Sequence, residues 1–176
     1  MARTVGRTRW ARRIARWGAW ATVWSLGLLI ALAALARFMD GPLGPFPGGP
    51  LEWGTLVDSS KVTTAIGHRS TIELQLFDPA LSRTTWIVEH DGELYVPCLM
   101  AGSWKQWPFQ AMEDGRALIR AGDRLYSRDL VRVRDTSLHA AVLERLGEKY
   151  GVEVDDPEDV WLFRLERPFE AVAGRL

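Results

Sequence analysis

The feature that most constrains this chain is a run of nineteen residues without a charge, from Gly18 to Ala36. A helix of that length extends roughly 28 Å, close to the thickness of the hydrocarbon core of a bilayer. Six arginines precede the run, and four tryptophans gather near its N-terminal end, where indoles favour the lipid headgroup region. The pattern predicts a basic cytoplasmic segment over 1–17 and a single transmembrane helix over 18–38.

The arginines also predict an orientation. Basic residues beside a membrane span are retained in the cytoplasm, so we expect the rest of the chain on the opposite side of the cell (inner) membrane, periplasmic or otherwise extracytoplasmic. Ala34-Leu35-Ala36 has the small-x-small pattern of a signal-peptide cleavage site, which keeps a cleaved leader as the alternative. The apolar stretch of a signal peptide is about 7–15 residues long, so the length favours a retained anchor.

Charge and composition exclude several kinds of site. The chain holds 22 basic and 22 acidic residues, and removal of the six N-terminal arginines leaves 16 basic against 22 acidic, which argues against a nucleic-acid surface. The single cysteine, Cys98, cannot form an internal disulfide and ends a predicted strand, where burial is expected. His68, His90 and His139 lie far apart without clustered ligands, so we expect no metal site.

A segment rich in proline and glycine separates the anchor from the remainder. Asp40 to Pro50 holds four prolines and four glycines, a composition that disfavours regular helix or strand. We therefore predict an extended, irregular linker over 39–52, one domain over 53–170 and a C-terminal tail over 171–176.

Alternating apolar and polar residues predict strands in that domain. Asp91-Gly92 and Gly122-Asp123 suit tight hairpin turns, because aspartate and glycine tolerate positive φ angles. The predicted strands are Lys61 to Ile66, Thr71 to Phe77, Thr84 to Glu89, Glu93 to Cys98, Ala117 to Ala121, Leu125 to Arg134 and Val160 to Glu166.

Two helices are expected. Apolar residues at three- and four-residue spacing predict an amphipathic helix over Ser137 to Tyr150, with Thr136 as its N-cap and Gly151 at its end. A shorter helix is expected from Trp104 to Met112. Successive hairpins interrupted by two helices favour the α+β class, with a small, mostly antiparallel split β-barrel of six to seven strands.

The stretch TTWIVEHDGELYVPCLMAGSWKQWPFQAMEDGRALIRAGDRLYSRDLVRVRD resembles the split β-barrel flavin-binding superfamily. The resemblance is to its deazaflavin-dependent nitroreductase and quinone-reductase branch and to pyridoxamine-phosphate-oxidase-like proteins. In that family a small-residue loop with lysine and tryptophan precedes a short helix, a hairpin and a late helix with an end like Lys149-Tyr150-Gly151. This chain departs from the family at Ala111 to Gly115, where an Asn-Pro turn is usual.

The resemblance implies FMN or a deazaflavin as cofactor. A phosphate would take close backbone contact, a hydroxyl and a positive charge from the loop, and indoles would cover the ring. The alternatives are a solvated lysine beside a turn and tryptophans packed in the core. The implied cofactor-binding residues are Gly102, Ser103, Trp104, Lys105, Trp107 and Arg116. No residue is identified as catalytic.

Two functions remain open at this stage. One is a membrane-anchored flavin- or deazaflavin-dependent oxidoreductase that reduces a quinone or another small acceptor. The other is a cofactor-less split-barrel interaction module, or an accessory subunit of a membrane complex. The expected partners are the lipid bilayer, a second copy paired through the barrel domain as in the resembling family, and a membrane protein. Arg116, Arg120, Arg124 and Arg128 either converge on one sheet face or form ordinary salt-bridged surface.

Overall fold

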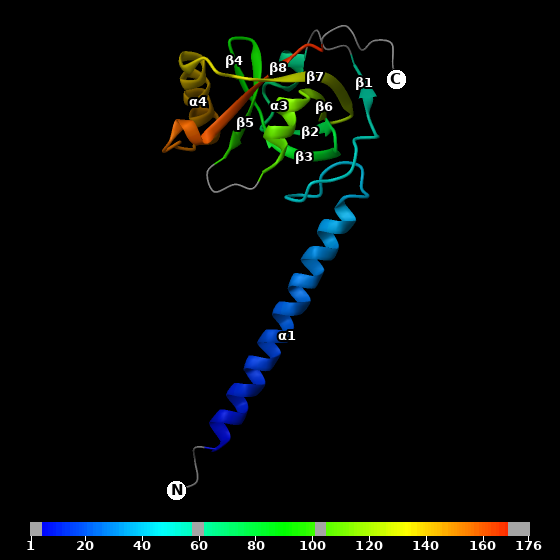
Figure 1. Ribbon diagram of the computed structural model, residues 1–176, viewed down its shortest axis with the longest axis vertical. Coiled ribbons are helices and arrows are strands. Elements are labelled where there is room, and N and C mark those ends of the chain that lie inside the picture. Colours follow the sequence, from blue (N-terminus) through cyan, green and yellow to red (C-terminus); the bar gives the residue numbers. More distant parts are fainter. Residues whose placement is uncertain (1–4, 58–61, 101–104, 169–176) are drawn as a thin grey trace.

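The computed structural model describes residues 5–57, 62–100 and 105–168, and it describes side chains within these ranges at residue 17 and from residue 20 onward. One long helix leads into a compact sheet domain (Figure 1). The helices are α1 (Val5–Ala36), α2 (Val62–Ile66), α3 (Trp107–Glu113), α4 (Thr136–Tyr150) and the 3-10 turn η2 (Pro157–Asp159). The strands are β1 (Thr55–Leu56), β2 (Thr71–Phe77), β3 (Ala80–Trp86), β4 (Val88–His90), β5 (Glu93–Leu99), β6 (Arg116–Ala121), β7 (Arg124–Arg132) and β8 (Val160–Glu166).

Helix α1 differs from the prediction in extent. It begins at Val5 and so includes most of the basic segment, because alanine and arginine are both good helix formers. Within the part of the chain that the structure describes, no helix is both long enough and apolar enough to cross a membrane. The transmembrane helix predicted over 18–38 is therefore not supported.

The sheet is antiparallel apart from one short parallel strand. Its order is β3-β2-β6-β7-β8-β5-β4, with β1 paired in parallel to β7. The two ends of this order, β3 and β4, are joined through the single residue Ile87, and β3 also contacts β5. The sheet must therefore curl back on itself, which gives a barrel-like α+β domain with an unpaired seam between β3 and β5 (Figure 1).

The strand predicted over Thr71 to Phe77 is confirmed as β2, although Gln75 on its polar face is also buried. Its bounds are Thr71–Phe77, and Ile72, Leu74 and Leu76 are buried. The strand predicted over Lys61 to Ile66 is wrong, because the described part of this segment forms α2, which buries Val62 and Ile66 four residues apart on one face. Strand β2 pairs with β6 and with β3, and it forms with β3 a hairpin through Asp78-Pro79 that the sequence did not predict.

The remaining strands and helices largely follow the predictions. Asp91 and Gly92 have φ angles of 50° and 79° and join β4 to β5, as expected. The strand expected over Thr84 to Glu89 is divided at Ile87 between β3 and β4. Helix α4 ends at Gly151 as predicted, but its N-cap is Asp135, whose carboxylate accepts the N–H of Leu138.

Apolar residues form two layers. The barrel interior is filled by one cluster, in which Leu74, Val96, Ile119 and Phe163 have no exposed surface. The outer face of β4, β5 and β8 is covered by α4, whose buried residues are Val142, Leu143 and Leu146. Burial of one such side chain contributes about 1.5–3 kcal/mol, so α4 is a structural part of the domain.

The proline- and glycine-rich segment lies against the sheet rather than extending away from it. Gly48 pairs with Ser82 of β3, and the Ser82 hydroxyl donates to the carbonyl of Gly49 at 2.6 Å. The N–H of Leu51 donates to the buried side chain of Gln75 at 2.6 Å. The N–H of Gly49 also donates to the carbonyl of Ala36 at 3.2 Å, so this segment connects the end of α1 to the sheet.

Candidate cofactor-binding site

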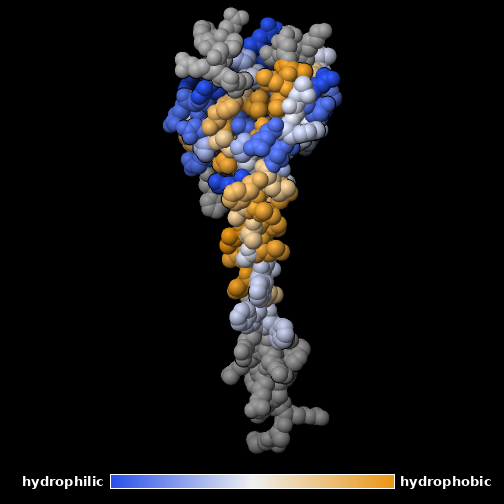
Figure 2. Space-filling view, turned by 90° about the vertical axis from the view of Figure 1, so that its right-hand side faces the viewer, coloured by the Kyte–Doolittle hydropathy of each residue, from blue (hydrophilic) through white to orange (hydrophobic). Residues whose placement is uncertain are grey.

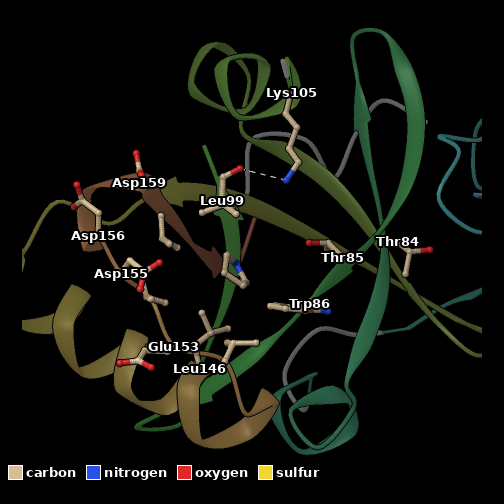
Figure 3. Close-up of a pocket in the computed structure, with 14 residues that line it drawn as sticks. Thr84, Thr85, Trp86, Leu99, Lys105, Leu146, Glu153, Asp155, Asp156 and Asp159 are labelled. Carbon is tan, nitrogen blue, oxygen red and sulfur yellow. Dashed lines mark hydrogen bonds between the residues drawn. The ribbon is translucent and has the colours of Figure 1, made fainter. Parts of the chain in front are cut away.

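A pocket of about 620 Å³ lies at the open seam of the barrel. Thr85 and Trp86 at the end of β3 form one side (Figure 3). Pro97 and Leu99 of β5 also line the pocket. Lys105 stands at one end of the pocket, where its Nζ donates to the carbonyl of Leu99 at 3.2 Å. The seam thus places an aromatic ring, a hydroxyl and a cation around one opening.

Trp86 is held in place from behind. Its ring stacks on that of Tyr150, with centroids 4.5 Å apart and planes inclined by 10°. The Tyr150 hydroxyl accepts the N–H of Ile87 at 3.1 Å and lies 2.5 Å from the carbonyl of Ser70, to which it can donate. Because Trp86 remains 42% exposed, a positioned indole surface is available to a flat ligand.

The wall opposite Trp86 carries negative charge. Glu153, Asp155, Asp156 and Asp159 line it, from the segment between α4 and β8 (Figure 3). These four carboxylates face an opening in which Lys105 is the single basic residue among the described lining. A phosphate would be favoured beside Lys105 and disfavoured along the acidic wall.

Several cations act on the buried thiol of Cys98 in β5. Burial raises the pKa of this thiol, while the charges of Lys105, Arg83 and Arg132 and a hydrogen bond with Trp107 oppose that rise. Burial also lowers the pKa of Arg83 to about 10.

The predicted site residues are only partly brought together. Gly102, Ser103 and Trp104 lie outside the described residues. Lys105 lines the pocket, whereas Trp107 is only 5% exposed and its ring centre lies 5.3 Å from that of Phe163. The structure thus places Trp107 in the core and not among the residues that line the pocket.

Arg116 belongs to a different region. Its guanidinium forms an ion pair with Asp114 at 2.6 Å and lies over the ring of Phe77. Asp114 holds the pKa of this exposed arginine above its usual value by hydrogen bonding. Arg116 does not line the pocket.

The four arginines of the third predicted hairpin do not converge. Arg120 lies on the outer face of the sheet and pairs with Asp40 and Glu73. Arg128 is opposite Ala117, a core residue, and is only 1% exposed. The four arginines therefore neither converge on one sheet face nor all lie on a solvent-exposed, salt-bridged surface.

Sequence reasoning missed Thr85, Trp86, Arg83 and Arg132. The hairpin of β2 and β3 carries Arg83 opposite Leu74, and its short turn was not recognised. Recognition of Asp78-Pro79 as a turn would have placed Arg83 on the apolar face. The seam itself depends on which strands fail to pair, which no local pattern shows.

No family model matches the sequence, and no curated protein does. One similar solved structure is a Listeria innocua protein provisionally described as a pyridoxamine 5'-phosphate oxidase, with 10% identity, a TM-score of 0.48, and coverage of 60% of this chain and 89% of that chain. Another is an F420 reductase, with 11% identity, a TM-score of 0.44, and coverage of 64% and 96%. At these values neither likeness carries an argument about what this chain binds.

Proposed function

We propose that this protein is an oxidoreductase that binds a flavin or deazaflavin in the seam pocket. The observation that carries the proposal is the meeting of Trp86 and Lys105 at one opening of about 620 Å³. A flavin needs a flat surface for its ring and a cation for its phosphate, and these two residues supply one of each. The residues present thus fit the group at the Lys105 end of the pocket.

The chain's own residues would act by positioning. Trp86, supported by Tyr150, would fix the plane of the ring, and Thr85 would offer a hydroxyl at its edge. Lys105, held against the Leu99 carbonyl, would orient the phosphate. The bound cofactor itself would supply hydride transfer. We propose a quinone or another small acceptor as the substrate, as the sequence resemblance implies.

The test is a titration of the full-length protein with FMN and with the deazaflavin coenzyme, read by tryptophan fluorescence and visible absorption. We expect saturable quenching in the wild type, with a Kd for the cofactor that is at least tenfold higher in Lys105→Ala and in Trp86→Ala. Arg124→Ala is the matched control, because Arg124 is exposed and lies outside the pocket lining. Absence of quenching in the wild type, or equal quenching in all four proteins, would reject the cofactor site.

A second function is favoured by the acidic wall. Glu153, Asp155, Asp156 and Asp159 would repel an anionic cofactor that extended across the pocket. A domain without a cofactor would serve as an interaction module or accessory subunit of a membrane complex. In that case neither flavin would bind.

We also propose that the protein associates with a lipid bilayer through α1. Figure 2 shows apolar residues covering the half of α1 next to the sheet domain. Trp24, Leu28 and Ile30 are 74%, 62% and 61% exposed. Apolar surface of this extent on a helix favours lipid or another apolar helix. We expect the wild type to float with phospholipid vesicles, and a Leu28→Glu/Ile30→Glu variant to remain in the aqueous fraction.

Pairing of two copies through the sheet domain is a further proposal taken from the sequence resemblance. Sedimentation of detergent-solubilised protein would distinguish a dimer from a monomer. A strictly monomeric protein that nevertheless bound flavin would show that one chain completes the site.

A further inference from the structure

Two arginines project into the barrel interior, one from β3 at the end of the strand order and one from β7 in its middle. Arg83 on β3 is opposite Leu74 of β2, and Arg132 on β7 is opposite Phe163 of β8. Leu74 and Phe163 both have no exposed surface. Because directly opposed residues share a sheet face, both arginine side chains project toward the core.

The two guanidinium groups lack hydrogen-bond partners at specific atoms. Nε of Arg83 and Nη1 of Arg132 are buried without a hydrogen-bond partner, and neither arginine forms an ion pair with an acidic residue in the described part of the chain. A buried N–H group without an acceptor carries a desolvation cost. A ligand that accepted these N–H groups would offset that cost.

Aromatic rings support the faces of both groups. The Arg83 guanidinium carbon lies 5.6 Å from the ring centre of Trp107, and that of Arg132 lies 4.3 Å from the ring centre of Trp161. A guanidinium held over a ring keeps N–H groups at its edge, where they suit the paired oxygens of a carboxylate or phosphate. Arginine is better adapted to this geometry than lysine.

The two arginines pack on one aromatic cluster in the barrel interior. Arg83 lies over Trp107, whose ring centre is 5.3 Å from that of Phe163. The guanidinium carbon of Arg132 lies 5.8 Å from the ring centre of Phe163. Arg83 and Arg132 are each only half-buried, so this cluster is reachable from solvent.

We propose that this part of the barrel interior binds an oxyanion, a carboxylate or a phosphate group, between Arg83 and Arg132. The ligand's oxygens accept from the guanidinium edges, and Trp107 and Trp161 hold the two groups in position. This site is separate from the ring position at Trp86, and it requires no flavin.

The test is thermal unfolding of the full-length protein with inorganic phosphate or acetate, each compared with sodium chloride at equal ionic strength. We expect at least one oxyanion to raise the Tm by about 5 °C or more at a hundredfold excess over its Kd. The better anion identifies the ligand class. No rise with either anion would overturn the proposal.

Variants locate the effect. Arg83→Met and Arg132→Met should abolish the rise, and without anion they should be no less stable than the wild type, because a buried N–H group without a partner has been removed. Arg83→Lys keeps the charge but loses the paired donors, so its half-saturating anion concentration should increase at least tenfold. Arg124→Met is the exposed control and should respond as the wild type does. An equal response in all variants would also overturn the proposal, whatever the outcome of the flavin titration.

Discussion

The guanidinium of Arg120 holds the carboxylate of Asp40, with Nη1 2.9 Å from Oδ1 and 2.8 Å from Oδ2, although 80 positions separate the two residues. Nη1 also donates to the carbonyl of Trp53 at 3.2 Å, and Nε donates to Glu73 at 2.5 Å. One side chain on β6 therefore holds both ends of the segment that joins α1 to the sheet.

The first prediction concerns this contact. Arg120→Met should destabilise the protein by roughly 1.5–3 kcal/mol, the range for hydrogen bonds to charged groups, and should expose the linker. Urea unfolding and limited proteolysis of 40–53 measure the two effects. Arg116→Met is the control, since its guanidinium pairs locally with Asp114. Unchanged stability and proteolysis in Arg120→Met would show that the linker is held by other contacts.

The same pair predicts a pH dependence. Burial acts to raise the pKa of Asp40, but hydrogen bonds from Glu52 and Arg120 more than offset this, so the pKa lies below its ordinary value of 3.8. The folded state thus favours the ionised form, and the stabilisation is present above the unfolded pKa and lost as the pH falls through the folded pKa. The difference in unfolding free energy between the wild type and Asp40→Asn should stay constant from pH 7 to about 5 and shrink below about 4. A difference that persisted at pH 2 would contradict the assignment.

Tyr150 gives a prediction about the seam. Its hydroxyl accepts the N–H of Ile87, the one residue between β3 and β4. Tyr150→Phe leaves that N–H without its partner and should cost about 1–3 kcal/mol by chemical denaturation. The ring stack with Trp86 would remain, so flavin quenching should change less than in Trp86→Ala. An unaltered unfolding free energy would mean that water replaces the hydroxyl.

Local sequence patterns predicted most of the elements for physical reasons. Alternation in β2, the positive φ angles of Asp91 and Gly92, and the left-handed end of α4 at Gly151 are set by neighbouring residues. Segment 62–66 was mistaken for a strand because β-branched residues are common in strands, whereas Val62 and Ile66 are buried four residues apart.

The site was less predictable because it depends on contacts between distant residues. Lys105 could be proposed as a cofactor-binding residue from its loop in the sequence. Trp86, in contrast, lines the pocket only because β3 and β5 remain unpaired. In the sequence, Arg83 and Arg132 look like ordinary surface residues. Only the strand register shows that they lie opposite core residues. The contact of Asp40 with Arg120 likewise could not be predicted, because the proline-rich composition around Asp40 does not indicate a distant partner.

Cys98 gives a prediction about reactivity. Its side chain is 3% exposed, and burial raises the pKa of the thiol, although nearby cations oppose the change. We expect a disulfide reagent to label the native protein at least a hundredfold more slowly than the urea-unfolded protein at pH 8, because both accessibility and thiolate population are reduced. Arg83→Met should slow the native reaction further by removing one stabilising charge. Faster labelling in that variant would mean that the side chain of Arg83 shields the thiol.

Gly48 gives the last prediction. It tests whether close packing at this glycine holds the linker in place independently of the ion pair between Asp40 and Arg120. A Cβ at this position would lie 1.7 Å from the carbonyl oxygen of Gly41, so Gly48→Ala cannot keep the observed backbone. We expect a cost of about 1–3 kcal/mol, the range for overpacking, with faster proteolysis of 40–53. Gly44→Ala is the matched control: no atom lies within 4 Å of its Cβ, and only its φ of +57° opposes the change. If Gly48→Ala were no more sensitive to protease than Gly44→Ala, the linker would not be packed against itself as the structure shows. If Gly48→Ala made the linker sensitive to protease while the pKa of Asp40 stayed below its ordinary value, the ion pair between Asp40 and Arg120 would be stable without the turn at Gly48.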